Sequence, residues 1–369
     1  MAALLPAAAF GQVMVEGKHF ELKPAEYSVA APPTLGPEKA KGLVIWNHGR
    51  GETAASEKAS PLALYFGQQG WDVYTLYRGW GNDDRTRALQ IVQSGIEKAQ
   101  SMGYKRIVLM GQSAGAYASI EAVRYGAAVD AVIATAPAAH GGGSTPNNAW
   151  RQNDFTMRTI WEKYEGAKAR VAVAYFEGDD YYEAHAPNIR GPWVSQTLSK
   201  YGVSHFVISQ PGFGSLKGHG AGQTWNFARR FGPCIYVFVE TGTAPSCDDS
   251  PTTLATFRIA VPPEFPRQAG DPIAGAWQGT WSHGRYTLLA FSSETSGTRK
   301  GLYRSGLSIS SERPENYELA LTRQGDAASW KLGRYIYEVR PSADDTLAVS
   351  RHDPAKPDDK ANALLRRAN

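Results

Sequence analysis

One serine of this chain stands in a context that suits nucleophilic chemistry. The apolar run 106–110 leads directly into residues 111–115, which read G-Q-S-A-G, and a stretch of helical length follows. A G-x-S-x-G pentapeptide between a strand and a helix forms a sharp, strained turn, in which the glycines let the two backbones approach closely. Such a turn exposes the serine hydroxyl at the edge of a sheet, where a carbonyl carbon can reach it. Ser113 is therefore the candidate nucleophile.

A serine nucleophile needs a base that accepts its proton and an acid that orients the base. His219 is the candidate base, because it lies in a glycine-rich loop after the last predicted strand and its glycine neighbours let the imidazole face Ser113. The acid is expected in the turn after the predicted strand 171–176, where Asp179 and Asp180 are adjacent. Neighbouring side chains point in different directions, so only one of the two can serve. We predict Asp180, because the turn usually needs about three residues between the strand and the acid, here residues 177–179.

Two other interpretations concern the same loops. His140 also follows a predicted strand, but it precedes the acid, whereas the usual order is nucleophile, acid and base. We interpret it as a loop or pocket-wall residue. The adjacent Asp179 and Asp180 also suit a metal site, yet the sequence offers no second cluster of carboxylates and histidines to support one. We therefore expect neither a metal nor an organic cofactor.

The oxyanion that forms during acyl transfer needs two backbone N–H donors. One is expected from Ala114, at the start of the helix that follows Ser113, because a helix N-terminus favours an anion. The other is expected from Gly49 or Arg50, in the turn 47–51 after a predicted strand. Glycines in that turn let a backbone N–H face the substrate without obstruction by a side chain.

Strand and helix signals alternate around these motifs. Short apolar runs, typical of strands covered on both faces, lie at residues 42–46, 72–76, 106–110, 131–134, 171–176 and 205–208. Amphipathic segments of helical length lie at residues 85–102, 114–125, 192–201 and 222–231. The alternation predicts an α/β fold, a doubly wound and mostly parallel sheet, over residues 12–240.

The pattern changes after residue 240. Residues 241–270 are rich in Pro, Thr, Ser and Asp, which predicts a linker. Residues 271–353 contain short, often alternating apolar runs, which predict a small antiparallel β sandwich or barrel. Its aromatic residues, Trp277, Trp281 and Trp330 among them, form either a packed core or a stacking platform for sugar rings. Residues 354–369 are charged, and we expect a frayed tail.

Taken in order, the motifs resemble those of the α/β-hydrolase fold family. The resemblance covers roughly residues 13–240 and rests on the turn 47–51, the pentapeptide 111–115, the acidic pair 179–180 and His219 between two glycines. It implies a Ser-His-Asp triad and an oxyanion hole on the fold described above. The turn 47–51, N-H-G-R-G, is similar to the single-glycine form of dienelactone-hydrolase-like and carboxylesterase-like enzymes rather than to the triple-glycine form of some lipases.

The resemblance also suggests where substrate binds. This family commonly places a lid at the position of residues 139–165. Aromatic residues beside the expected site turns, namely Trp80, Tyr117, Trp150 and Tyr181, are candidates for a hydrophobic acyl or aryl slot. The alternative is that these rings only pack the lid and the helices.

Composition limits the other partners and the cellular location that the protein can have. The 369 residues are 42% hydrophobic and 20% charged, with a net charge of +4 whose basic residues are scattered, so we expect no nucleic-acid partner. After the first 11 residues, no segment approaches the ~20 continuous apolar residues of a membrane span. Residues 1–11 resemble the end of a secretory signal, and Cys234 and Cys247 are expected to form a disulfide. Both features favour a periplasmic or secreted protein.

The sequence therefore predicts an exported serine hydrolase that cleaves carboxylic esters, either small or borne by a polymer. An amidase or peptidase that uses the same triad is the nearest alternative, because the two reactions share nucleophile, base and oxyanion hole. A further alternative is a non-catalytic binding protein whose β domain, residues 271–353, contacts carbohydrate.

Overall fold

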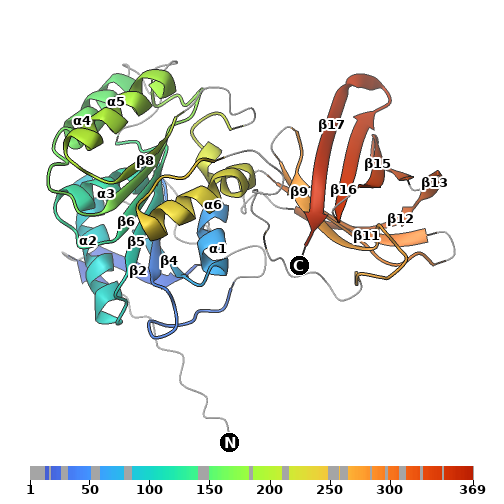
Figure 1. The fold of residues 1–369 in the computed structure, drawn as a ribbon, viewed down its shortest axis with the longest axis horizontal. Helices are drawn as coiled ribbons and strands as arrows, with labels where there is room; N and C mark the ends of the chain where they lie inside the picture. Colours follow the sequence, from blue (N-terminus) through green and yellow to red (C-terminus); the bar gives the residue numbers. More distant parts are fainter. Residues whose placement is uncertain are drawn as a thin grey trace, which may run out of the picture.

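In the computed structural model the described residues are 13–15, 18–25, 32–50, 59–78, 85–139, 149–182, 186–209, 216–247, 257, 265–282, 285–295, 298–306, 313–324, 327–342 and 345–368. They form an α/β unit and then a β unit, which lie side by side in Figure 1. The expected signal segment 1–11 lies outside the described residues, as do residues 248–256 and 258–264 of the expected linker.

A twisted sheet of eight strands forms the centre of the α/β unit, in the order β1-β2-β4-β3-β5-β6-β7-β8. Strands β3 to β8 pair in parallel with their neighbours, whereas β2 pairs antiparallel with β1 and β4. The strands are β1 (Val13–Val15), β2 (Lys18–Pro24), β3 (Leu43–Asn47), β4 (Asp72–Tyr77), β5 (Ile107–Gln112), β6 (Ala131–Thr135), β7 (Arg170–Ala174) and β8 (His205–Ile208). The predicted mostly parallel α/β sheet is confirmed.

Helices cover both faces of this sheet, and Figure 1 shows α1 and α6 on one face and α2 to α5 on the other. They are α1 (Pro61–Gln68), α2 (Arg85–Ser101), α3 (Ala114–Arg124), α4 (Ala149–Trp161), α5 (Ala186–Lys200), the 3-10 helix η1 (Ala221–Gln223) and α6 (Trp225–Thr241). Side chains alternate along each strand, so Leu43 and Ile45 pack in the cluster of α2 to α5, and Val44 and Trp46 in the cluster of α1 and α6. Burial on both faces explains why the central strands β3, β5 and β6 are largely apolar runs.

Helix α1 is absent from the predicted elements, although its start carries two local signals. Ser60 caps the helix, because its Oγ accepts a hydrogen bond from the Ala63 N–H at 3.3 Å, and Pro61 occupies the first turn. Helix α6 begins near the predicted segment 222–231 but continues to Thr241. It ends at Gly242, whose φ of 78° supplies the left-handed cap that favours glycine.

The β unit is a single antiparallel sheet of nine strands in the order β12-β11-β10-β9-β17-β16-β15-β14-β13. The strands are β9 (Gly275–Thr280), β10 (Tyr286–Phe291), β11 (Thr298–Gly306), β12 (Arg313–Ala320), β13 (Thr322–Gln324), β14 (Ala327–Leu332), β15 (Tyr335–Ser342), β16 (Thr346–Asp353) and β17 (Lys356–Arg367). Its two edge strands, β12 and β13, are joined by Leu321 alone. The two edges therefore meet at this corner, and the sheet curls into a nearly closed barrel.

The expectation of a frayed C-terminal tail is wrong. Residues 356–367 form β17, which pairs with β16 along its length and with β9 at Arg366 and Arg367. Ala361 and Leu365 are buried, whereas Asn362 and Leu364 are exposed, as expected of a strand covered on one face. The charged first half of β17 hides this alternation in the sequence.

The tryptophans of the β unit form its core. Trp277, Trp281 and Trp330 are at most 5% exposed, and they pack with Tyr337 inside the barrel. Trp330 and Tyr337 stack with a centroid distance of 5.3 Å. These three rings therefore form a packed core, which is one of the two alternatives that the sequence left open for them.

A linker residue joins the two units. Phe257, which is 1% exposed, packs edge-on against Trp225 of α6 and Tyr65 of α1. Its backbone N–H donates to Gln278 Oε1 in β9 at 2.9 Å. Buried residues of β9, β10 and β11 belong to the same apolar cluster as α1 and α6. The β unit is thus fastened to the α/β unit by a shared core.

The predicted disulfide is confirmed: Cys234 of α6 is bonded to Cys247. It secures the chain where it leaves α6. Among the described residues, no helix is long and apolar enough to cross a membrane. In the same residues, histidine, cysteine, aspartate and glutamate side chains form no cluster that suits a metal ion.

Candidate active site

Ser113 lies at the turn between β5 and α3, and its backbone is strained. Its φ of 54° and ψ of −122° fall in a region of backbone conformation that residues other than glycine rarely adopt. The backbone on both sides holds this conformation, because the Ser113 N–H donates to the Thr135 carbonyl and the Ser113 carbonyl accepts from the Ala138 N–H, each at 3.1 Å. The sharp turn predicted from G-Q-S-A-G is therefore present.

This turn requires two glycines, because the backbone leaves no room for a Cβ at either position. A Cβ on Gly111 would lie 2.6 Å from the Gly115 carbonyl carbon. A Cβ on Gly115 would lie 2.2 Å from the Asn47 carbonyl oxygen and 2.4 Å from that of His48. Gly115 thus lets the start of α3 touch the turn that follows β3, the turn expected to supply an oxyanion donor.

The imidazole of His219 links Ser113 to an aspartate. His219 Nε2 lies 2.8 Å from Ser113 Oγ, and His219 Nδ1 lies 2.9 Å from Asp179 Oδ1. A carboxylate can only accept, so Nδ1 carries the proton and Nε2 is the acceptor for the serine hydroxyl. Asp179 is 3% exposed and Ser113 is 7% exposed, whereas the His219 side chain between them is half-buried.

The structure corrects the choice between the two neighbouring aspartates. Asp180, which we expected to orient the imidazole, is exposed, and Asp179 takes that place. The reason is the register of two loops: Glu177 and Lys217 form a parallel β-bridge, and Asp179 and His219 each follow their bridge residue by two positions. Gly178 and Gly218 have similar left-handed φ values of 71° and 81°, so both chains turn the same way. Asp179 and His219 therefore meet.

The turn after β3 is held by a buried arginine that the sequence did not single out. Arg78, which is 0% exposed, donates through Nη2 to the carbonyls of His48 at 2.6 Å and Gly49 at 3.1 Å. Both carbonyls are thereby directed toward the protein interior. His48 is itself buried, with Nδ1 2.7 Å from the Gly49 oxygen.

Comparison with known proteins adds a sequence-family match. Residues 38–170 match a family model described as "Serine aminopeptidase, S33". This segment contains the turn after β3 and the Ser113 turn within the sheet order given above. The chain contains an α/β-hydrolase domain. The matched segment ends before Asp179 and His219.

Solved structures also resemble the α/β-hydrolase domain. The monoacylglycerol lipase of Paleococcus ferrophilus is 15% identical, with a TM-score of 0.44, over 61% of this chain and 99% of that one. A puromycin-hydrolyzing peptidase of Mycobacterium tuberculosis is 14% identical, with a TM-score of 0.44, over 66% of this chain and 42% of that one. Est1E of Butyrivibrio proteoclasticus, bound to ferulic acid, is 15% identical with a TM-score of 0.41, over 57% and 90% of the two chains. No curated protein sequence matches this chain significantly.

Within the α/β-hydrolase domain, Gln112 ties the nucleophile turn to the base. Its Nε2 donates to the His219 carbonyl at 3.1 Å, and its Oε1 accepts from Gln223 Nε2 at 3.2 Å. The side chain therefore fixes the main chain of His219 relative to Ser113. Gln112 is the variable second position of G-x-S-x-G, so the motif gives no signal for this role.

Tyr181, one of the four expected pocket aromatics, lies directly against the candidate base. Its ring stacks on the His219 imidazole, with a centroid distance of 3.8 Å and an interplanar angle of 17°. Its backbone N–H donates to Asp179 Oδ1 at 3.0 Å. Its carbonyl accepts from Asn153 Nδ2 of α4 at 3.1 Å. Tyr181 thus contacts both the base and the acid.

The other expected pocket residues give a mixed result. Tyr117 is 6% exposed and packs in the core beneath α3, with its hydroxyl 3.3 Å from Glu121 Oε1, so the expectation that it lines a pocket is wrong. Trp150 is half-buried at the start of α4, within the expected lid, and Arg151 lies over its ring. Trp80 and His140 lie outside the described residues.

An ion pair between a buried arginine and a half-buried aspartate joins helices α4 and α5. Arg190 of α5 pairs with Asp154 of α4, and its guanidinium lies 4.4 Å from the centre of the Tyr182 ring. Burial lowers the pKa of Arg190 to about 10, so the side chain stays charged at neutral pH. The pair fixes the helix that carries Asn153.

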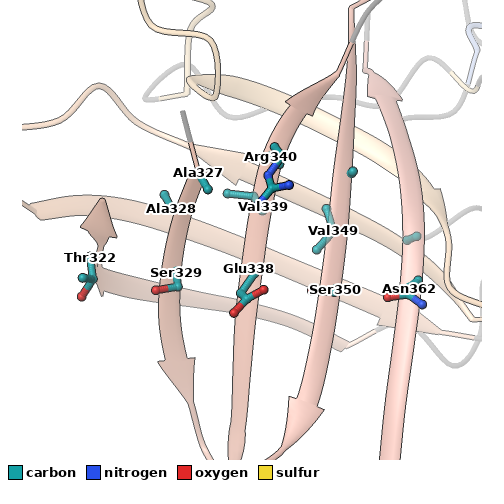
Figure 2. Close-up of a pocket in the computed structure, with 12 residues that line it drawn as sticks. Thr322, Ala327, Ala328, Ser329, Glu338, Val339, Arg340, Val349, Ser350 and Asn362 are labelled. Atoms are coloured by element: carbon teal, nitrogen blue, oxygen red, sulfur yellow. The ribbon is translucent and has the colours of Figure 1, made fainter. Parts of the chain in front are cut away.

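A cavity of about 530 Å³ lies in the β unit rather than beside the triad. Figure 2 shows the residues that line it on neighbouring strands. Ser329, Glu338, Ser350 and Asn362 are partners in the sheet register and form one polar row across β14 to β17. None of the lining residues belongs to the α/β-hydrolase domain, so this cavity is not the site of the triad's chemistry.

Proposed function

We propose that this protein is an exported serine hydrolase that cleaves carboxylic esters through an acyl-enzyme intermediate. The observation that carries the proposal is the relay from Ser113 Oγ through the His219 imidazole to Asp179, with distances of 2.8 and 2.9 Å. These are hydrogen-bond distances for a nucleophile, its base and the group that orients the base.

In the proposed reaction, Ser113 Oγ attacks the ester carbonyl carbon while His219 Nε2 accepts the hydroxyl proton. The imidazolium is stabilised by the Asp179 carboxylate and then gives its proton to the leaving alcohol. Water attacks the acyl-enzyme with His219 as base, which releases the acid and restores Ser113. The Ala114 N–H and one N–H from Gly49 or Arg50 are proposed to hold the oxyanion.

Amide or peptide cleavage is the second candidate, and the description of the matching family model favours it. The relay of Ser113 and His219 serves both reactions. They differ in the leaving group, since an amine must be protonated before it departs, whereas an alcohol leaves more readily. Ester cleavage therefore demands less of the same groups, and we take it as the primary proposal.

Export is part of the proposal. The disulfide between Cys234 and Cys247 supports it, because such bonds persist in oxidising compartments. The substrate remains a prediction at the level of class: a small ester, or an ester borne by a polymer. The carbohydrate contact expected from the β unit also remains a prediction, and it can no longer rest on Trp277, Trp281 or Trp330, which are buried.

The experiment that tests the proposal is turnover of p-nitrophenyl esters with acyl chains of increasing length, beside aminoacyl p-nitroanilides, by the wild type and Ser113→Ala. We expect ester turnover that the variant loses by at least about a thousandfold, because the nucleophile is absent. Turnover of the anilides alone would favour the peptidase. If no substrate turns over and a fluorophosphonate does not label Ser113, the protein is not a serine hydrolase and the binding-protein alternative takes its place.

A further inference from the structure

The strongest observation that the proposed reaction does not use is the stack between Tyr181 and His219. The two rings are nearly parallel, at 17°, with centroids 3.8 Å apart. Tyr181 follows Asp179 by two residues, and its N–H donates to the same Oδ1 that lies 2.9 Å from His219 Nδ1. One residue therefore covers the face of the base and fixes the oxygen that orients it.

The position of Tyr181 is set from outside the triad. Asn153 of α4 is 0% exposed, and its Nδ2 donates to the Tyr181 carbonyl at 3.1 Å. Its Oδ1 accepts from the Ala139 N–H at 2.7 Å, next to Ala138, whose own N–H donates to the Ser113 carbonyl. Asn153 thus braces the acid turn against the segment that supports the nucleophile. The ring is placed over the imidazole by this frame rather than by chance contact.

The stack favours the positively charged imidazolium of His219 over the neutral imidazole. The face of an aromatic ring attracts a cation, and the attraction grows when water is excluded. His219 carries a positive charge only after it accepts the proton of Ser113, which happens as the acyl-enzyme forms. An interaction that strengthens only at this stage lowers the barrier of the chemical step and leaves substrate binding unchanged.

We propose that Tyr181 is a positioning residue for the base: its ring holds the His219 imidazole between Asp179 and Ser113 and stabilises the imidazolium as it forms. The inference rests on the proposed hydrolase function and deepens it. The role belongs to the aromatic face and not to the hydroxyl. The main chain of His219 is held independently by Gln112, so removal of the ring does not release the loop.

Three variants separate these contributions, with kcat and KM measured on the p-nitrophenyl ester that the wild type hydrolyses best. Tyr181→Phe keeps the ring and should stay within about threefold of wild type. Tyr181→Leu keeps apolar bulk without an aromatic face, and kcat should fall about tenfold while KM changes less than about twofold. Tyr125→Leu removes an exposed tyrosine at the end of α3 and should change neither constant. Tyr181→Met replaces the leucine variant if that one does not fold.

Three results would overturn the inference. A Tyr181→Leu enzyme with wild-type kcat would show that the ring does not assist the base. A loss confined to KM would make Tyr181 a substrate contact, and an equal loss in Tyr181→Phe would assign the role to the hydroxyl. Ser113→Ala, assayed in parallel, keeps the two proposals apart: if it retains activity, the hydrolase mechanism fails, whereas an inactive Ser113→Ala beside an unaffected Tyr181→Leu refutes this inference alone.

Discussion

The choice of acid gives the sharpest test of the site, because the chain supplies its own control. Asp179 and Asp180 are adjacent and chemically identical, but only Asp179 is buried and contacts His219. Replacing either aspartate by asparagine keeps the shape of the side chain and removes its charge. The structure predicts a large loss of activity from Asp179→Asn and almost none from Asp180→Asn.

The size of the loss follows from the contacts of Asp179 Oδ1. The N–H of Tyr181 donates to this oxygen at 3.0 Å, so an asparagine would keep its carbonyl oxygen there and still accept from His219 Nδ1. The histidine tautomer is then preserved, and the loss is that of the negative charge beside the imidazolium. Two unit charges about 4 Å apart interact by about 4 kcal/mol at an effective dielectric constant of about 20. That energy corresponds to roughly a thousandfold in rate.

The assay is kcat/KM for a p-nitrophenyl ester, with thermal unfolding of each variant as the check on folding. We expect a loss of roughly a thousandfold for Asp179→Asn and less than about twofold for Asp180→Asn. The melting temperature of Asp179→Asn should not fall, because within the described residues Asp179 Oδ2 has no hydrogen-bond partner and neutralising a buried carboxylate removes a desolvation cost. The reasoning is refuted if Asp180→Asn is the damaging change, or if Asp179→Asn loses less than about tenfold.

The remaining predictions concern the framework around the site. Gly115→Ala should destabilise the protein by roughly 3 kcal/mol, because the new Cβ meets the Asn47 carbonyl at 2.2 Å, whereas Gly220→Ala, with open space around its Cβ, should leave the melting temperature unchanged. Equal melting temperatures for the two variants would contradict the close contact. Replacing Cys234 and Cys247 together by serine should cost about 3 kcal/mol, the value for a closed loop of about 15 residues, and lower the unfolding midpoint in denaturant. A reductant should lower the wild-type midpoint similarly and leave the double variant unchanged.

Much of the α/β-hydrolase domain could be predicted because its signals are local. The central strands β3, β5 and β6 are buried along their whole length and are therefore largely apolar. The nucleophile turn needs glycines at fixed distances from Ser113, and the contacts of Gly111 and Gly115 with backbone atoms explain that requirement. His219 stands out because a loop with glycines on both sides of a histidine is locally unusual.

Other features depend on which segments pair, and local patterns do not carry that information. Asp179 and Asp180 are equivalent in the sequence, and the bridge between Glu177 and Lys217 selects the first by register. The register of β17 against β16 likewise gives the C-terminal segment its place in the sheet. A period of two residues means that a shift by one exchanges the inner and outer faces.

At the candidate site, too, local features could be predicted from the sequence, whereas contacts between distant segments could not. The sequence by itself identified the candidate nucleophile Ser113, the candidate base His219 and most of the strands and helices that carry them, because each depends on residues within one turn or one element. Only the tertiary structure decided that Asp179 rather than Asp180 contacts His219, that Gln112 and Arg78 hold the two loops, and that Tyr181 covers His219. These contacts join residues far apart in the chain, and their geometry is fixed only once the sheet has brought its loops together.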